Sequence, residues 1–303
     1  MSIITTSNNP KLLFPGIRAI FGNKYAELPK EYTDLVDIST STRAYEEDVM
    51  QTGFNHIQVK PQGSSIQYQA DTQGPVVRYP MITYGGGFIV TEEEREDNLY
   101  MDVVKRRLPG LVYAANQTKE LVVANLYNKA FDSAAPTADG LSLCNTAHTH
   151  VTNNGTFSNR YDADISEAAL ETMLILTMNA TDDQNLKIKL MPKSLHVSTT
   201  DWFNANRILK SVYRPGTQLN DINVIAAENA LPMGIKVNHY FDTPKAWFIR
   251  TGGVQSGLNL FQRKELAISD DNDFDTKNHK YSVTERYAVG VSDVRALYGS
   301  AGD

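Results

Sequence analysis

The segment that most constrains this fold is residues 54–84, in which apolar and polar side chains alternate. A period of two indicates β-strands. The alternation is broken at residues 61–65 and 71–75 by Pro, Gly, Ser and Asp, which favour turns. We therefore expect an extended, hairpin-like excursion. Few of its apolar side chains are large enough to build a core, so the excursion must pack against its own domain or against a neighbouring chain.

Residues 1–53, which precede this hairpin, are polar and only weakly periodic. Two interpretations fit their composition equally well. They form either an arm laid over another surface or the loosely packed N-terminal segment of an ordinary domain.

The clearest helix signal follows the hairpin at Thr91. Thr91 can cap a helix while Glu94, three residues later, reaches back to the cap, which is the spacing of a capping box. Acidic residues dominate the start of this segment and basic residues its end, so both ends complement the helix dipole. We predict a helix over residues 91–108 that Pro109 stops or kinks. A second helix is predicted from about residue 111 to 129, and the two would form a long rod.

The rest of the chain mixes helices and strands without a regular βαβ rhythm, which indicates an α+β fold rather than a doubly wound sheet. Residues 132–165 are rich in Asp, Asn, Gly, Ser and Thr, which is typical of a long ordered loop. Helices are predicted over residues 166–177, capped by Ser166, and over residues 200–209. Strands are predicted at residues 186–197, 224–227, 234–241, 246–250, 258–263 and 281–291.

Composition excludes several classes of protein. Among 303 residues there are 29 Lys and Arg against 35 Asp and Glu, and a net charge of −6 excludes a globally basic nucleic-acid coat. The single cysteine, Cys144, excludes an internal disulfide framework. The sequence has no stretch near the roughly 20 consecutive apolar residues that cross a bilayer, and its N-terminus resembles neither a signal nor a transit peptide. We therefore expect a folded protein in the cytoplasm where it is made.

Two motifs resemble ligand-binding loops but lack defining residues. Gly85-Gly-Gly87 has neither the Lys-Ser/Thr ending of a phosphate loop nor the dinucleotide-binding pattern, so we expect a flexible junction between a strand and a helix. Residues 271–275, Asp-Asn-Asp-Phe-Asp, begin like a calcium loop. Thr276 and Ser282 stand where that loop needs Gly and Glu, so we expect a solvated acidic turn between strands.

The densest group of metal-capable side chains is Cys144-Asn-Thr-Ala-His148-Thr-His150. Three ligands can hold a zinc ion, yet a structural zinc site takes four, and a catalytic one also needs an open water position. We expect a polar loop in which His148 makes hydrogen bonds. The alternative is a metal- or Cys-dependent enzyme centred on Cys144, His148 and His150. Our main interpretation has no catalytic, cofactor-binding or metal-binding residues and no cofactor.

Short motifs run through nearly the whole chain in a distinctive order. The most telling is residues 83–100, TYGGGFIVTEEEREDNLY. Others are ADGLSLCNTAH at 138–148, SN at 158–159, SEAAL at 166–170, LMPKSLHV at 190–197, WFIR at 247–250, DNDFD at 271–275, TERY at 284–287 and LYG at 297–299. In this order and spacing they resemble the major capsid proteins, or major head proteins, of tailed double-stranded DNA bacteriophages, including Mu-type head subunits.

The resemblance implies an α+β chain with the HK-ninety-seven-like phage capsid fold. Within that fold, the implied division is an N-terminal arm over residues 1–53, an extended E-loop over 54–84, a peripheral domain with a long spine helix over 85–165, an axial domain over 166–255, and C-terminal strands over 256–303 that return to the peripheral domain.

The function implied by the resemblance is structural and not enzymatic. The chain would self-assemble in the host cytoplasm into pentamers and hexamers of an icosahedral phage head that encloses the double-stranded DNA genome, and it would remain in the virion capsid. The implied partners are other copies of the chain, a separate scaffolding protein, a portal, a decoration protein and, by non-specific contact, the packaged DNA; no membrane is involved. Beside the enzyme, the other alternative is a tail or decoration protein of the virion.

Overall fold

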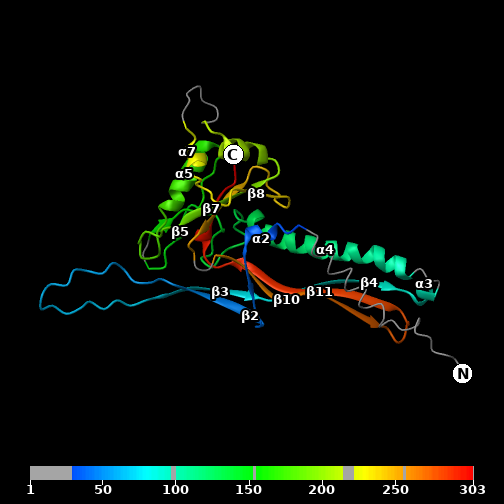
Figure 1. Cartoon of the computed structure of the whole chain (residues 1–303). Coiled ribbons are helices and arrows are strands. Elements are labelled where there is room, and N and C mark those ends of the chain that lie inside the picture. Colours follow the sequence, from blue (N-terminus) through cyan, green and yellow to red (C-terminus); the bar gives the residue numbers. More distant parts are fainter. Residues whose placement is uncertain (1–28, 97–99, 153–154, 214–221, 255–256, 303) are drawn as a thin grey trace.

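The computed structural model describes residues 29–96, 100–152, 155–213, 222–254 and 257–302. Figure 1 shows an elongated lower part, in which long strands and one long helix run side by side, and a compact upper part built on a second sheet. A loop projects from one end of the lower part. Helices and strands are mixed, with both parallel and antiparallel pairing, so the predicted α+β class is confirmed.

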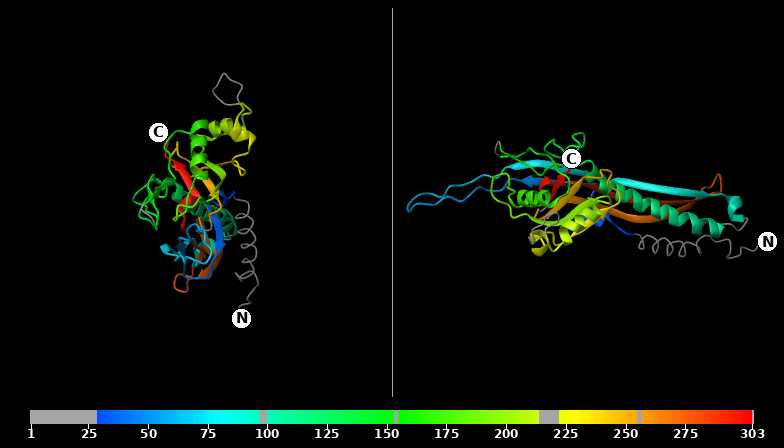
Figure 2. Two further views of the ribbon diagram at one scale, coloured as in Figure 1. Left: turned by 90° about the vertical axis from the view of Figure 1, so that its left-hand side faces the viewer. Right: turned by 90° about the horizontal axis from the view of Figure 1, so that it is seen from above.

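The lower part is a four-stranded sheet with a helix along one face. Its strands, in order across the sheet, are β1 (Asp37–Thr40), β10 (Leu258–Asn272), β11 (His279–Val291) and β4 (Ile82–Val90). β10 and β11 form a long antiparallel hairpin, and β1 joins β10 in parallel. α4 (Tyr100–Asn128) runs alongside these strands in the side view and from above (Figures 1 and 2).

α4 continues through Pro109, so a stop at this proline is wrong, and the segments predicted on either side of it belong to one long helix. Leu108 and Val112, on either side of the proline, are fully buried against Val90 and Tyr281 of the sheet. Proline in a helix interior costs about 3 kcal/mol, and burying two large apolar side chains yields at least a comparable amount. Packing against the sheet therefore overrides the local preference of Pro109.

The start of the helical region agrees with the predicted cap. Thr91 Oγ1 accepts the backbone N–H of Glu94 at 3.3 Å, and α3 (Glu92–Glu96) follows. The Glu94 carboxylate pairs with Arg107 of α4 at 3.4 Å. Residues 97–99, which separate the two helices in the sequence, lie outside the described residues.

Gly85, Gly86 and Gly87 lie inside β4, so the prediction of a flexible strand-to-helix junction is wrong for them. Gly87 pairs with Ser282 of β11, and a Cβ atom at Gly87 would lie 2.5 Å from the carbonyl oxygen of Tyr281. Glycine is therefore required here by the close approach of two strands.

The upper part is a second four-stranded sheet, in the order β12 (Leu297–Ser300), β9 (Trp247–Gly252), β7 (Met191–Ser198) and β8 (Ile235–Asn238). Its strands pack in one apolar cluster with α5 (Glu167–Met178), α6 (Trp202–Lys210) and α7 (Val224–Ala227). Phe248 of β9 instead meets Tyr127 near the end of α4, with ring centroids 5.2 Å apart. The upper sheet thus lies between its own helices and the end of the long helix.

Two helix starts in the upper part show how caps decide local structure. Ser166 Oγ accepts the N–H of Ala169 at 3.2 Å and caps α5, as predicted. Asn223 accepts the N–H of Ala226 at 3.3 Å and begins α7, so the strand predicted at residues 224–227 is wrong. An Asn before a short apolar run favours a helix start as readily as a strand boundary.

Two predicted strands differ in extent or partner. The strand predicted at residues 186–197 begins only at Met191, and β10 is longer than predicted because it continues to Asn272. β12 pairs with β9, so the last strand belongs to the upper sheet. We expected all strands of residues 256–303 to lie together in the lower part, where β10 and β11 are. The short elements β5 (His148–Thr149), β6 (Thr156–Phe157) and η3 (Val294–Ala296) complete the fold.

The predicted hairpin is paired differently from the expectation. β3 (Gln73–Pro80) pairs antiparallel with β2 (Tyr45–Gln51), which precedes the segment we identified as the hairpin. Residues 54–72 are all described and contain no strand. Before residue 53 the chain also forms α2 (Tyr32–Leu35) and β1, while residues 1–28 of the expected arm lie outside the described part. Among the helices that the structure describes, none is long and apolar enough to cross a membrane.

Candidate functional site

Cys144, the proposed centre of an enzyme site, is part of the apolar core. It is fully buried in the cluster that includes Phe248 and Leu297. Burial raises the pKa of the Cys144 thiol, so the reactive thiolate is disfavoured at neutral pH. Within the described ranges, no group of three or more His, Cys, Asp or Glu side chains is arranged to hold a metal ion.

His148 has a structural role, as predicted. Its ring is fully buried, with Nδ1 2.5 Å from Asp139 Oδ2 and Nε2 3.1 Å from Asn159 Oδ1. The Asn159 amide group donates to the carbonyl oxygens of Leu143 and Leu297, which fixes its own orientation. Burial raises the pKa of Asp139, but hydrogen bonds, chiefly from His148, outweigh burial and lower it to about 2. His148 therefore joins segments of the 132–165 loop to one another.

His150 belongs to a different buried group. Its Nδ1 lies 3.5 Å from Asp183 Oδ1, and its ring packs against Phe157 at 5.3 Å between centroids. Arg295 pairs with the same Asp183 at 3.1 Å and with Asp293 at 3.5 Å. Cys144, His148 and His150 are thus divided among a core and two separate polar groups, and the enzyme alternative has no structural support.

Asp271 and Asn272 end β10, and residues 273–278 form the turn to β11, so the predicted acidic turn between strands is confirmed from Asp273 on. Asp273 accepts a hydrogen bond from Lys280 Nζ at 2.6 Å and another from the backbone N–H of Asp275 at 3.2 Å. The hydrogen bond from Lys280 is the main cause of a lowered pKa of Asp273. The carboxylate oxygens of Asp273 therefore stabilise the turn through these hydrogen bonds.

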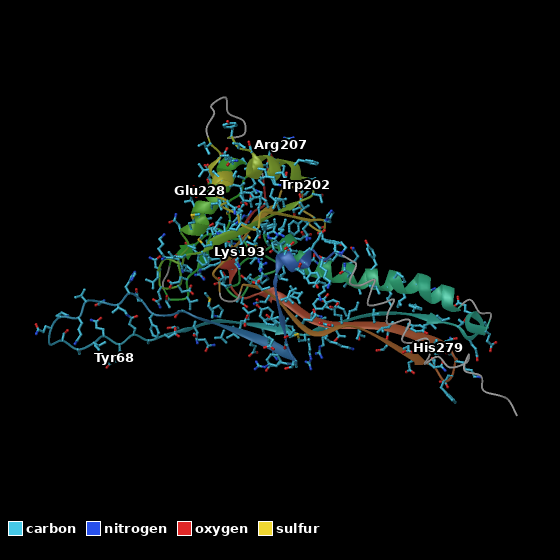
Figure 3. The ribbon with its side chains drawn as sticks, in the orientation of Figure 1. Tyr68, Lys193, Trp202, Arg207, Glu228 and His279 are labelled. Atoms are coloured by element: carbon cyan, nitrogen blue, oxygen red, sulfur yellow. The ribbon has the colours of Figure 1, made fainter. Side chains whose placement is uncertain are left out.

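The feature with the clearest functional implication is the loop of residues 53–72, which we call the projecting loop. It extends well beyond the body in Figure 1, and Figure 3 marks Tyr68 on it. Tyr68, Ile57 and Val59 are 94%, 95% and 93% exposed. Side chains of this type are normally inside a protein, so the projecting loop presents apolar groups with nothing of its own chain to cover them.

The two limbs of the projecting loop are joined by side chains instead of a backbone ladder. Asp71 Oδ1 accepts the N–H of Gly53 at 3.1 Å. Gln69 accepts the N–H of Asn55 at 2.7 Å and donates to the carbonyl oxygen of His56 at 3.2 Å. The limbs therefore run together, while most backbone groups near the tip stay available to another surface.

α2 forms a joint between the two parts that the sequence did not predict. Glu120 of α4 accepts the backbone N–H groups of Glu31 and Tyr32 at 2.9 and 2.8 Å. The Glu31 carboxylate in turn accepts the backbone N–H of His239 in the upper part at 3.0 Å. The residues are far apart in sequence, so no local pattern signals this arrangement.

Large apolar side chains are also exposed on the helices of the upper part. They include Ile175 and Met178 of α5 and Trp202 and Phe203 of α6. The sequence carried a signal for α5, because only Glu167 and Glu171 are charged among its twelve residues. A helix that is apolar on all sides is usually buried.

Comparisons with known proteins give a family match and a set of solved structures with the same fold. A family model described as phage capsid protein matches residues 75–300. No curated protein sequence matches the chain.

Solved structures share the fold. The procapsid of bacteriophage JBD30 is similar with a TM-score of 0.54 and 13% identity, over 99% of this chain and 77% of that one. The capsid of Myoviridae phage XM1 has a TM-score of 0.53 and 9% identity, over 89% and 90% of the two chains. The capsid of the native GTA particle has a TM-score of 0.53 and 12% identity, over 90% of each. At these identities the likeness concerns the fold, which is the one that the sequence motifs implied.

Proposed function

The chain belongs to the phage capsid protein family, and on that premise we propose that its copies assemble into the pentamers and hexamers of an icosahedral head that encloses a double-stranded DNA genome. The family assigns the chain to the virion capsid and gives it a structural role. Assembly of the head in the host cytoplasm is part of the proposal.

The observation that carries this proposal is the projecting loop. Ile57, Val59 and Tyr68 are almost fully exposed in the single chain, and burying each of them on a neighbour would contribute about 1.5–3 kcal/mol. A closed shell repeats the same contact many times, so these small contributions add up to a large stabilisation of the whole assembly. In a single chain these side chains stay exposed to water, whereas in a shell a neighbouring copy covers them.

We extend the proposal to the parts of the chain. Residues 1–53 are assigned to an arm that is anchored in the body from Tyr32 on, and residues 54–84 to the E-loop. Residues 85–165 and the strands β10 and β11 form a peripheral domain with α4 as its spine helix. Residues 166–255, together with β12, form the axial domain that meets its copies around the capsomer axes.

The proposed partners follow from this role. Beside other copies of the chain they are a separate scaffolding protein, a portal and a decoration protein. The net charge of −6 supports containment of the packaged DNA, with small cations neutralising the phosphates, over tight binding by the shell.

The test is to express the chain with a candidate scaffolding protein and to image the products by electron cryo-microscopy. Closed shells made of five- and six-membered rings are the expected result. A protein that stays monomeric in the presence of the scaffolding protein would contradict the proposal. Tubes, or binding only to preformed shells, would instead support the tail or decoration alternative.

A further inference from the structure

α5 carries an exposed stripe of one acidic and two apolar side chains. Glu171, Ile175 and Met178 are spaced by four and three residues, so they lie on the same side of the helix. Ile175 and Met178 are 59% and 52% exposed, and Glu171 is partly exposed. A solvent-facing helix usually has several charged residues on this side, so this stripe has the composition of a surface that another element covers.

α6 carries a stripe of matching spacing and opposite charge. Phe203, Arg207 and Lys210 are again separated by four and three residues, and all three are exposed. Trp202 packs against Phe203 with ring centroids 4.8 Å apart, which enlarges the apolar end of the stripe. Aromatic and arginine side chains of this kind dominate the energetics of protein interfaces.

The two stripes differ in their charged side chains, which are Glu171 on α5 and Arg207 and Lys210 on α6. In the part of the chain that the structure describes, Glu171, Arg207 and Lys210 form no ion pair. The two helices pack in the same cluster on the upper sheet, and Asn204 of α6 donates to the carbonyl oxygen of Ile165, just before α5, at 3.0 Å. Figure 3 shows Trp202 and Arg207 at the top of the upper part, away from the lower sheet and α4.

We propose that the Phe203–Arg207–Lys210 stripe of one copy packs on the Glu171–Ile175–Met178 stripe of the next copy around a ring. Phe203 then covers Ile175 and Met178, and Arg207 pairs with Glu171. The two faces differ, so the contact is heterologous, and with the five- or six-fold rotation of the proposed pentamers and hexamers it closes into a ring. α5 and α6 of successive copies form one continuous helical layer. This inference rests on the proposed function, because the occupant of each stripe is a second copy in the shell.

The first test reverses the two charges. E171R and R207E should each lower the yield of closed shells at least tenfold, because each places like charges opposite one another. The double variant E171R/R207E should restore the yield, because the opposite charges are present again in exchanged positions. E228R reverses another exposed acidic residue of the upper part, on the C-terminal side of α7, and should leave the yield unchanged. All four are surface changes, and circular dichroism should show unaltered protomers.

The second test uses cysteine. Cys144 is fully buried and does not interfere. A mixture of the I175C and F203C variants, oxidised after assembly, should give disulfide-linked dimers, and neither variant alone should do so. A link within one chain cannot form in this mixture.

The outcomes separate the inference from the proposed function. If the unsubstituted chain forms no shells, the proposed function fails. If it forms shells while E171R and R207E assemble normally, or while the double variant is not rescued, or while the cysteine mixture stays unlinked, the inference is overturned and the proposed function stands.

Discussion

The carboxylate of Glu120, in the C-terminal third of α4, accepts the backbone N–H of Tyr32 at 2.8 Å, although the two residues are 88 positions apart. The other carboxylate oxygen accepts the N–H of Glu31. Both hydrogen bonds hold the start of α2, where the described chain enters the body. Glu120 is almost completely buried, so these donors and the carboxylate depend on one another.

Replacing Glu120 by alanine should lower the free energy of unfolding by about 2–4 kcal/mol, because two buried N–H groups lose their acceptor. Denaturant titration of the soluble protomer measures this. T118A, an exposed substitution two residues earlier on the same helix, should change the value by less than about 0.5 kcal/mol. Equal stabilities of E120A and the unsubstituted chain would show that water replaces the carboxylate freely.

The stability of the protomer should depend on pH through the same group. Burial is the largest influence on Glu120 and raises its pKa from 4.5 to about 7. Between pH 4.5 and about 7, the folded state therefore keeps a proton on Glu120 that the unfolded state has released. The contribution to stability is fully present below pH 4.5 and is lost as the pH rises to about 7, by up to about 3 kcal/mol.

Thermal melting between pH 5 and 8 provides the measurement. The melting temperature should fall across this range in the unsubstituted chain, and the fall should be smaller in E120Q, which cannot ionise at this position. The same slope in both proteins would assign the pH dependence to another group.

Making the projecting loop polar should abolish shells without unfolding the protomer. In I57S/V59S/Y68S, each replaced side chain is more than 90% exposed, so the free energy of unfolding should change by less than about 1 kcal/mol. Electron microscopy should show no closed shells, because the apolar contacts with neighbours are gone. Q58S/Q67S, two polar substitutions on the same loop, should assemble normally. Normal shells from the serine triple variant would remove the loop from the assembly mechanism.

The two glycines Gly87 and Gly110 should respond in opposite ways to alanine. At Gly87 the new Cβ would lie 2.5 Å from the Tyr281 carbonyl oxygen, so β4 or β11 must shift. We expect a loss of about 1–3 kcal/mol. Gly110 lies inside α4 with no heavy atom within 4 Å of a new Cβ, so alanine there should stabilise the protein by about 0.5–1 kcal/mol. Chemical denaturation of both variants gives the comparison.

Ring parity offers a further test of the contact between α5 and α6. In an equal mixture of E171R and R207E, favourable contacts form only between unlike variants. A six-membered ring can alternate the two variants, whereas a five-membered ring must keep at least one repulsive contact. Imaging should therefore show sheets or tubes of six-membered rings and few closed shells. Closed shells in normal yield would contradict the assigned contact.

The sequence predicted local features well where one segment decides its own structure. Thr91 and Ser166 cap helices as their spacing indicated, and His148 makes the expected hydrogen bonds. The prediction at Pro109 failed because the burial of Leu108 and Val112 outweighs the helix-breaking effect of proline.

Features that depend on distant segments were beyond local patterns. Gly87 looked like part of a flexible junction because its neighbour Tyr281 is almost two hundred positions away in the sequence. In the projecting loop, alternation predicted strands that residues 54–72 do not form, and it did not show that β3 pairs with a strand before residue 54. The candidate site centred on Cys144 was excluded by the burial of Cys144 in the apolar core, which cannot be read from a sequence motif.

The sheet topology also sets the order in which the protein can mature on the ribosome. β1 cannot pair until β10 is synthesised, more than two hundred residues later. The upper sheet gains its last strand only when residues 297–300 emerge from the ribosome. Since domains fold as their segments are synthesised, an interrupted chain has open strand edges in place of finished surfaces. Only chains translated through Ser300 can therefore present the complete upper sheet to their neighbours.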